Sequence, residues 1–342
     1  MINAYIYFLN ILRKLSKSLA KKEVLFEELI TFLKYKKKKN LFDSVNNLSE
    51  FKNYFINIKN YQILSSLKVK ACIPFYYSKN KKKNLIKVCK NLANIFSEID
   101  LTIITNNRSF KISKDQISKK NSKCKIKMHY SSSKHHPRIM PWEHFFIMNK
   151  EFNKKKFTHY LYLEDDIFIS KKNIIYWIAA RNFLKKFNLI PGFVRFELNY
   201  NKKLYAIDTH KKNKFSSKPK IFCKKKNFAF INTSFPYHAM YFYDQELMRE
   251  HLFGISSNPD YGHGSCDINY LNRKLINLSL LEKANVGLIY KNAPEEFLNR
   301  SVVPVKLKEK LLYKYCLINH LSNKYTNQTS VINQISVNKV FF

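Results

Sequence analysis

Three consecutive acidic residues, Glu164, Asp165 and Asp166, are the part of the sequence best suited to chemistry. Adjacent carboxylates repel one another unless positive charge lies among them, and the chain holds only 24 acidic residues against 62 basic ones, so the cluster is not an effect of composition. Mg²⁺ and Mn²⁺ bind oxygen ligands of this kind, and substrate phosphates complete the shell around one or two carboxylates. The triplet therefore predicts a divalent-metal site that holds a diphosphate.

The apolar run before the triplet predicts where these acids lie. Residues 160–169 have the character of a strand, and residues 160–163 are apolar enough to be buried on both faces of a parallel sheet. Open α/β sheets bind ligands at the carboxyl ends of their strands, which is where the triplet follows. The alternative is a surface turn whose acids pair with neighbouring lysines, but the buried run favours the edge of a core.

Strands alternate with helices along most of the chain after Lys68. We expect strands at residues 69–77, 101–105, 124–130, 160–169, 193–198, 228–231 and 239–243, and helices at 84–96, 140–149, 173–187, 245–252 and 266–275. This order predicts an α/β fold with a mixed, mainly parallel sheet flanked by helices. Residues 211–220 are polar and predict a loop.

Three regions follow from the pattern of apolar residues. Residues 1–66 show helical spacing and predict a helical accessory region, residues 67–330 form the main domain, and residues 331–342 form a tail. The apolar run at residues 4–12 is too short to span a bilayer and no cleavage site follows it. We expect a cytoplasmic protein; a cationic helical face resting on the anionic inner surface of the membrane is the alternative.

The six cysteines are widely spaced and include no CxxC pair, which predicts reduced thiols. The formal net charge of +38 would ordinarily indicate an anionic partner. However, lysine, asparagine, isoleucine, phenylalanine and tyrosine are all abundant while glycine and tryptophan are rare, as in a chain from an A/T-rich genome. Arginine, the better reader of bases and phosphates, is scarce, so nucleic-acid binding is not favoured. Whether the charge is functional stays open.

The triplet resembles the DxD-type motif of GT-A glycosyltransferases, the nucleotide-diphospho-sugar transferase superfamily. The flanking motifs follow an order similar to that of uncharacterised bacterial and fungal proteins with this fold, over about residues 68–325. The motifs are His136-Pro137, Pro141-Trp142-Glu143-His144, YLEDDI around the triplet, Tyr176-Trp177, and PGFVRFE at residues 191–197. The resemblance implies a Rossmann-type GT-A domain that moves a sugar from a nucleotide diphosphate sugar to a saccharide or glycolipid hydroxyl.

The resemblance also implies roles for individual residues. Glu164 would orient the ribose or the sugar, and Asp166, with Asp165 beside it, would bind Mn²⁺ or Mg²⁺. Family members place a catalytic base after a glycine-containing loop, and Asp267 follows such a loop here; the family usually has Glu-Asp where this chain has Cys266-Asp267. Capping of a helix is the alternative role for Asp267. A retaining enzyme needs no base at that position.

A histidine near the C-terminus is a further metal ligand in many GT-A enzymes, and His320 is the matching candidate. His238 and His263 compete with it and have acceptor binding as their alternative role. The donor nucleotide would lie near residues 73–80 and the end of the second strand. The candidate contacts there are Tyr76, Asn80, Thr105 and Asn106, each of which can equally close a turn or cap a helix. Arg195 and Glu197 alternate on one strand, so they pair with each other or contact the sugar.

Two other classes of protein compete with the transferase interpretation. A noncatalytic protein that binds carbohydrate or a membrane surface would keep the fold, but the intact triplet argues against it. A metal-dependent nuclease or phosphoesterase would use the same carboxylates but normally needs more acids for two ions. A zinc site from Cys124, His129, His135 and His136 lacks evident tetrahedral spacing. The sequence contains no P-loop, no GxGxxG fingerprint and no GxSxG elbow.

Overall fold

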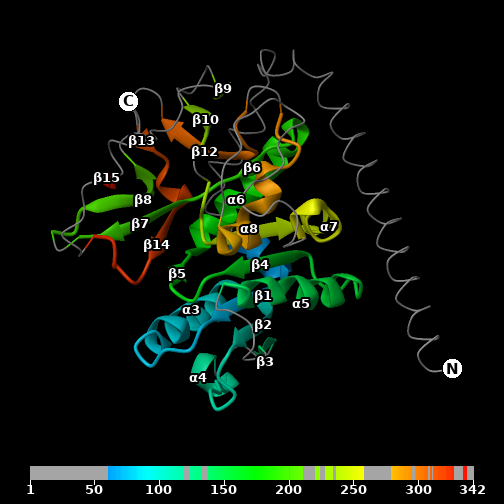
Figure 1. The fold of residues 1–342 in the computed structure, drawn as a ribbon. Coiled ribbons are helices and arrows are strands. Elements are labelled where there is room, and N and C mark those ends of the chain that lie inside the picture. Colours follow the sequence, from blue (N-terminus) through cyan, green and yellow to red (C-terminus); the bar gives the residue numbers. More distant parts are fainter. Residues whose placement is uncertain are drawn as a thin grey trace.

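The computed structural model describes residues 61–118, 123–131, 138–199, 201–210, 220–223, 228–233, 236–257, 279–294, 297–306, 309, 311–326 and 334–336 (Figure 1). Only residues 61–66 of the predicted accessory region are included, as the 3-10 helix η3 (Tyr61–Ser66), and only β15 (Gln334–Ser336) of the predicted tail. The helix expected at residues 266–275 and nearly all of the loop expected at 211–220 lie outside the described residues.

A five-stranded sheet, sheet A, forms the centre of the molecule, with the strand order β11-β4-β1-β2-β3. β1 pairs in parallel with β2 and β4, β2 pairs in parallel with β3, and only β11 runs antiparallel, against β4. The strands are β1 (Lys68–Phe75), β2 (Glu98–Thr105), β3 (Cys124–Tyr130), β4 (His159–Leu163) and β11 (Met240–Asp244). The prediction of a mixed, mainly parallel sheet is confirmed, and all five strands were expected from the sequence.

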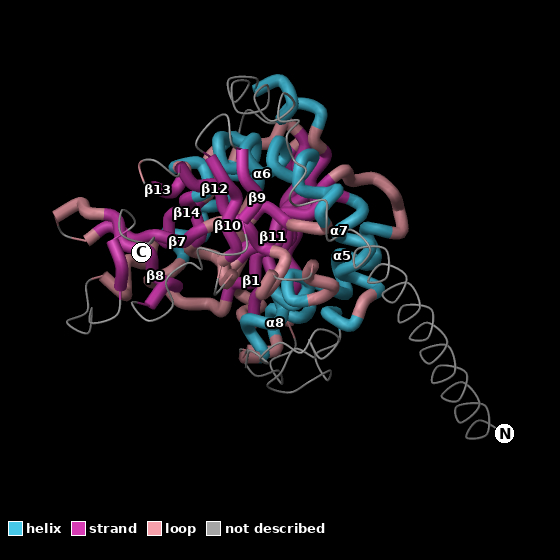
Figure 2. The backbone as a smooth tube through the Cα atoms, turned by 90° about the horizontal axis from the view of Figure 1, so that it is seen from above, coloured by secondary structure: helices cyan, strands magenta, loops and turns pink. Residues whose placement is uncertain are grey.

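Helices cover both faces of sheet A. Tyr241 and Phe242 are neighbours on β11 and therefore point to opposite faces. His144 of α5 and His251 of α7 lie 5.6 and 5.0 Å from the ring of Tyr241, whereas Trp177 of α6 lies 5.0 Å from Phe242. Figure 2 shows α5 and α7 together on one side, apart from α6. The helices are α3 (Lys82–Ile95), α5 (Glu143–Phe152), α6 (Lys171–Leu184) and α7 (Gln245–Phe253).

Two further sheets extend from this layer structure. Sheet B has the order β15-β8-β7-β14-β5, and sheet C has the order β13-β12-β10-β9 with β6 paired to β12. Their strands are β5 (Ile167–Phe168), β6 (Ile190–Pro191), β7 (Val194–Leu198), β8 (Leu204–His210), β9 (Lys220–Cys223), β10 (Phe228–Asn232), β12 (Ser301–Lys306), β13 (Leu311–Leu312) and β14 (Leu317–His320). The sequence patterns predicted β7 and β10 but neither the short strands nor β8, β12 and β14.

The single strand expected at residues 160–169 is wrong in one respect. β4 ends at Leu163 in sheet A, and β5 belongs to sheet B. The backbone N–H of Ile167 donates to the carbonyl of Glu164 over 3.2 Å, which closes a turn within the acidic triplet. The triplet therefore forms the corner at which the chain passes from one sheet to the other.

The remaining described helices are short. They are α4 (Lys114–Ile117), α8 (Leu280–Val286), η4 (Met140–Trp142), η5 (Lys185–Phe187), η7 (Ile255–Ser257), η9 (Gly287–Tyr290) and η10 (Lys314–Cys316). Within the described ranges, no helix has both the length and the apolar character needed to cross a membrane. Cys72, Cys89, Cys124 and Cys316 are buried free thiols.

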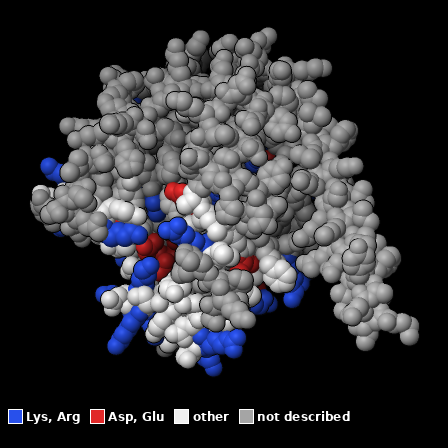
Figure 3. Space-filling model, in the orientation of Figure 1, with Lys and Arg blue, Asp and Glu red and all other residues white. Residues whose placement is uncertain are grey.

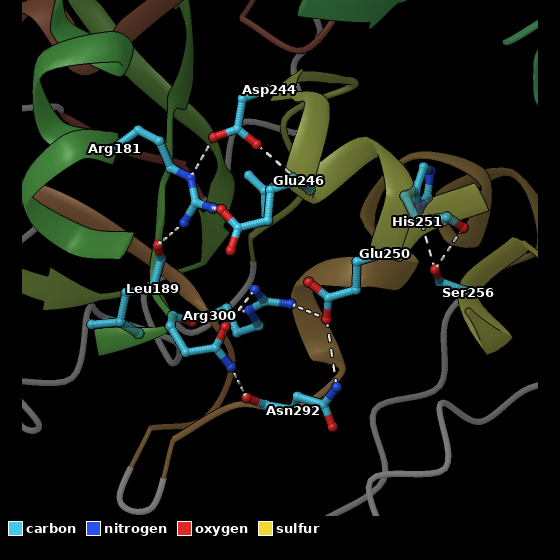
Figure 4. Close-up of polar contacts among 11 residues, drawn as sticks. Arg181, Leu189, Asp244, Glu246, Glu250, His251, Ser256, Asn292 and Arg300 are labelled. Atoms are coloured by element: carbon cyan, nitrogen blue, oxygen red, sulfur yellow. Dashed lines mark hydrogen bonds and ion pairs between the residues drawn. The ribbon is translucent and has the colours of Figure 1, made fainter. Parts of the chain in front are cut away.

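Two buried arginines connect α7 to the loop that follows α6 (Figure 4). Arg181 donates to Asp244 over 2.9 Å and to the carbonyl of Leu189 over 3.4 Å. Arg300 donates to Glu250 over 2.7 Å and to the backbone and side-chain oxygens of Asn188 over 3.0 and 2.7 Å. Because both guanidinium groups are nearly inaccessible to water, these charge-assisted hydrogen bonds fix sheet C against α7.

Another ion pair is buried inside sheet A itself. The ammonium of Lys70 on β1 donates to Asp100 over 2.5 Å and to Thr102 over 2.6 Å, both on β2. Lys127 on β3 donates to the second oxygen of Asp100 over 2.8 Å, but its side chain is 53% exposed while that of Lys70 is 1% exposed. Lys70 thus depends on Asp100 for the compensation of a charge that water cannot reach.

Asp100→Ala is expected to destabilise the fold by about 3–5 kcal/mol, because it leaves the buried ammonium of Lys70 without its counter-ion. The matched variant Lys127→Gln removes an exposed partner of the same carboxylate and should cost about 0–1 kcal/mol. Urea unfolding measures both. Equal losses of unfolding free energy in the two variants would show that Asp100 does not stabilise the buried Lys70 more than it stabilises the exposed Lys127.

Candidate functional site

The three carboxylates of the triplet point in different directions and meet different partners. The corner after β4 is held by the N–H of Glu164, which donates to the carbonyl of Ala239 over 3.0 Å. From this corner Glu164 faces Tyr237, Asp165 faces the loop between β1 and α3, and Asp166 faces sheet B. The repulsion expected of three adjacent acids is reduced by this divergence, and Glu164 and Asp166 each meet a hydrogen-bond donor of their own.

Glu164 accepts a hydrogen bond of 2.6 Å from the hydroxyl of Tyr237. The guanidinium of Arg195, on β7, lies 4.6 Å from the centre of the Tyr237 ring, a cation–π geometry. Burial raises the pKa of Glu164, although the charge of Arg195 and the Tyr237 hydrogen bond oppose that rise. Arg195 therefore brings a buried positive charge close to Glu164, and both residues contact Tyr237.

Asp166 forms an ion pair with His320, which is itself held on its far side by Glu197. Nε2 of His320 lies 3.1 Å from Asp166 Oδ2, and Nδ1 lies 2.5 Å from Glu197 Oε1. The second oxygen of Glu197 accepts hydrogen bonds from the backbone N–H groups of Tyr325 and Thr326 over 3.0 and 2.8 Å and from the Thr326 hydroxyl over 3.0 Å. Each ring nitrogen of His320 therefore has a carboxylate oxygen within hydrogen-bond distance, and the hydroxyl of Ser322 lies 3.2 Å from Nδ1 and 3.1 Å from Nε2.

The strand β14 delivers His320 to this position. It lies between β7, to which it runs parallel, and β5, to which it runs antiparallel. In the antiparallel pair His320 stands opposite Ile167, directly after the triplet, and the N–H of Leu321 donates to the carbonyl of Asp166 over 2.8 Å. Backbone pairing, rather than side-chain attraction alone, therefore fixes the distance between His320 and Asp166.

The pKa shifts agree with this arrangement. Burial would lower the pKa of His320, but its hydrogen bonds to Asp166 and Glu197 outweigh burial and raise the pKa above its ordinary value. Burial would likewise raise the pKa of Asp166, yet the hydrogen bond and charge of His320 hold it below the ordinary value. The pKa of Glu197 is lowered against burial by His320 and by the N–H of Thr326. The three groups form a carboxylate–imidazolium–carboxylate unit.

Asp165 differs from its neighbours because it lacks a close partner. Its Oδ2 atom is buried and has no hydrogen-bond partner. Burial, together with the charge of Asp166, raises the pKa of Asp165 to about 7, and the more distant charge of Lys81 opposes this only partly. A buried carboxylate oxygen without a donor is costly unless something binds it. Asp165 is therefore the member of the triplet that is open to a ligand.

The donor set of Asp165, Asp166 and His320 suits a hard divalent cation. Carboxylate oxygens are the ligands that Mg²⁺ and Mn²⁺ accept, and imidazole also binds Mn²⁺. The unpartnered oxygen of Asp165 fits such an ion. Within the described part of the chain, however, no group of three or more His, Cys, Asp or Glu side chains is arranged to hold one metal ion, and His320 is hydrogen-bonded to Asp166. The protein offers two carboxylates as its first ligands.

The polar residues expected around the nucleotide lie at the same edge of sheet A, with structural contacts of their own. The side-chain oxygen of Asn106 accepts from the N–H of Tyr77 over 2.8 Å and so ties the end of β2 to that of β1. Thr105 is fully buried, and its hydroxyl accepts from the N–H of Asn107 over 3.4 Å. Tyr76, with 48% of its surface exposed, and Asn80 are open to solvent.

His238 is buried, whereas the notion that it contacts an acceptor calls for an accessible side chain. Its Nε2 lies 3.2 Å from the hydroxyl of Ser301, and burial lowers the pKa of His238 to about 3. Gly192 stands nearby, and a Cβ atom at that position would lie 2.2 Å from the same hydroxyl. The absence of a side chain at Gly192 therefore lets the backbone of the PGFVRFE motif pass close to Ser301. β7, which carries Arg195 and Glu197, begins two residues later.

Of the other predicted residues, Asp267 and His263 lie outside the described residues, as do His135 and His136. The structure brings together the triplet, Arg195, Glu197 and His320. Sequence reasoning missed Tyr237 and Thr326, which hold Glu164 and Glu197. Tyr237 directly precedes the candidate residue His238, but a tyrosine in an aromatic stretch gives no signal of a carboxylate partner.

Comparisons with known proteins add little to this geometry. No protein-family model matches the chain, and no curated protein matches it. Among solved structures, the chain is similar to S. aureus TarS residues 1–349, with 14% identity and a TM-score of 0.29. The match covers 54% of this chain and 49% of that chain, so the chain spans about half the length of the protein it matches. The function is therefore argued from the site itself.

Asp165→Asn is expected to alter the pH dependence of stability in chelator-containing buffer. Because the pKa of Asp165 is about 7 in the folded chain against 3.8 ordinarily, the folded chain binds this proton more tightly, and stability falls as the pH rises between these values. In urea unfolding, the free energy of unfolding of the variant should exceed that of the native chain by about 2 kcal/mol at pH 8 and equal it near pH 4.

The control for this experiment is Asp115→Asn, which neutralises an exposed acid in α4. Its effect on the free energy of unfolding should be small at both pH values. A difference between Asp165→Asn and the native chain that stays constant from pH 4 to pH 8 would show that Asp165 titrates normally and is not the buried, uncompensated acid described above.

Proposed function

We propose that this chain is a glycosyltransferase that moves a sugar from a nucleotide diphosphate sugar to a hydroxyl of a saccharide or glycolipid acceptor. One observation carries the proposal: Asp165 and Asp166 stand at the carboxyl edge of a mainly parallel sheet, with one buried carboxylate oxygen unpartnered and His320 delivered beside them by a distant strand. This edge is where α/β sheets bind nucleotides, and the acids suit the cation that accompanies a diphosphate. The order of motifs along the chain supports the same reading.

Asp165 and Asp166 would hold Mn²⁺ or Mg²⁺, and Nε2 of His320 would become a third ligand on losing the proton that it now shares with Asp166. When bound, the cation would neutralise the diphosphate that leaves as the glycosyl bond breaks. Glu197 keeps Nδ1 of His320 engaged, which leaves Nε2 as the nitrogen directed at the acids. A carboxylate of this kind behind a ligand histidine orients the ring and raises its basicity.

Arg195 and Glu164 would act on the donor from the other side of the triplet. The Arg195 guanidinium is buried and rigidly stacked on Tyr237, so it supplies a fixed positive charge toward the diphosphate. Glu164, held by the Tyr237 hydroxyl, retains one oxygen to accept a hydrogen bond from a ribose or sugar hydroxyl. Tyr76 and Asn80, exposed at the end of β1, stand where the nucleotide would enter.

The acceptor hydroxyl must lose a proton as it attacks the anomeric carbon. For an inverting reaction Asp267 stays our proposed base, and His263 stays a proposed acceptor contact; a retaining reaction needs no base at Asp267. We place the reaction in the cytoplasm, and for a glycolipid acceptor at the inner face of the membrane.

The chain is expected to hydrolyse one or more nucleotide sugars slowly in the presence of Mn²⁺, because water can replace the acceptor. A panel of nucleotide sugars, followed by release of the nucleotide diphosphate, identifies the donor. Asp166→Asn should lower kcat/KM by about a hundredfold by weakening the cation site. The exposed-acid variant Asp115→Asn should stay within about twofold of the native chain.

Two results would contradict the proposal. One is a failure of every nucleotide sugar to bind, with or without Mn²⁺, in calorimetry. The other is Mn²⁺-dependent cleavage of nucleic acid or of a simple phosphoester that is lost in Asp166→Asn, which would make the chain a nuclease or phosphoesterase instead.

A further inference from the structure

Three segments of the chain that meet beside the acidic triplet contain no acidic residue at all. They are residues 68–97, 167–196 and 310–326, which include α3, β5 with α6, and η10 with β14. Together these segments carry exposed lysines. These exposed lysines include Lys79, Lys81, Lys83, Lys87, Lys90, Lys171, Lys172, Lys314 and Lys324. The excess of positive charge in these segments is stronger than in the chain as a whole, which has 24 acidic residues against 62 basic ones.

Hydrogen bonds hold the three segments against one another. The side-chain amide of Asn91 on α3 donates to the carbonyl of Ile169 over 2.6 Å. The amide of Asn173 at the start of α6 donates to the carbonyls of Tyr315 and Leu317 over 2.7 and 2.8 Å. The lysines of the separate segments therefore belong to one surface whose shape is fixed by the backbone.

Aromatic rings lie among these lysines. The ammonium of Lys87 is 5.4 Å from the centre of the Phe168 ring, and the ammonium groups of Lys172 and Lys314 are 5.7 and 5.5 Å from the Tyr315 ring. We call these five residues the lysine–aromatic surface. It begins two residues after Asp166, and Figure 3 shows Lys and Arg side chains around a small group of Asp and Glu side chains on this face of the molecule.

The chemistry of this surface selects among anionic partners. Its two rings are partly buried, so they offer a bilayer less apolar surface than the exposed apolar side chains of membrane-surface helices do. It contains no arginine, the residue that best reads phosphates and bases in nucleic acids. The partly exposed ring of Tyr315 has two ammonium groups over it, and it suits a sugar ring whose carboxylate or phosphate draws these ammonium groups from the ring to itself.

We propose that the lysine–aromatic surface binds an anionic saccharide chain, and that the acceptor of the transfer is therefore a negatively charged glycan. The role of this saccharide as acceptor rests on the proposed function, whereas its binding to the surface does not. The chain would lie across Tyr315 and Phe168, with its anionic groups on Lys87, Lys172 and Lys314, and its end would reach the triplet at the start of β5.

The test uses the full chain and oligogalacturonate, a carboxylated saccharide, in calorimetric titrations without any nucleotide sugar. The variant Lys87→Gln/Lys172→Gln/Lys314→Gln should bind it about tenfold more weakly, and the dependence of affinity on salt should become shallower because fewer counter-ions are displaced. The matched control Lys150→Gln/Lys156→Gln/Lys203→Gln removes three exposed lysines elsewhere and should stay within about twofold of the native chain. Tyr315→Leu should weaken binding even at high salt, because stacking is not screened.

Several outcomes would overturn the inference. An uncharged malto-oligosaccharide that binds equally well would remove the role of charge. Equal losses in the two triple variants would assign the binding to net charge alone. Tighter binding of single-stranded DNA or of phosphatidylglycerol vesicles, lost in the same variant, would assign the surface to nucleic acid or to a membrane. Since no donor is present, loss of oligogalacturonate binding and failure of nucleotide-sugar hydrolysis are separate results.

Discussion

The repulsion between three adjacent carboxylates at the end of a buried strand is the constraint on which the rest of the structure depends. Glu164, Asp165 and Asp166 are tolerated there because the chain turns sharply and directs each acid to a different surrounding. Satisfying Asp166 takes a histidine from β14, and holding that histidine takes Glu197 from β7. Two strands of sheet B thus supply the residues that compensate the negative charge of Asp166, which follows the end of β4 in sheet A.

The sequence predicted the framework well because local periodicity determines it. The strands of sheet A and the helices α3, α5, α6 and α7 lie where apolar spacing placed them, within a few residues at each end except at the end of β4, which stops at Leu163. β14 and β12 were missed, because short strands such as Leu317–His320 in a lysine- and asparagine-rich stretch carry no clear alternation. Their pairing partners, β7 and β5 for the first and β10 for the second, lie far away along the chain.

The candidate site was predictable in its residue types but not in its contacts. The triplet and His320 were identified from motif order, and the structure does bring His320 to Asp166. What the sequence left open for Glu197 was a choice between Arg195 and a sugar; the structure pairs it with His320. That pairing depends on the register of three strands, which no local pattern specifies. Asn106 similarly became a link between strand ends, a role that polar turn residues often take.

The place of β14 between β7 and β5 makes the site depend on contacts between distant parts of the chain. Glu197 and His320 are 123 residues apart, so their contact closes a long loop and forms late. Sheet A can assemble from earlier segments, and an intermediate of that kind would present the triplet with no imidazole to compensate it. The compensation of the acidic corner thus depends on the docking of one four-residue strand.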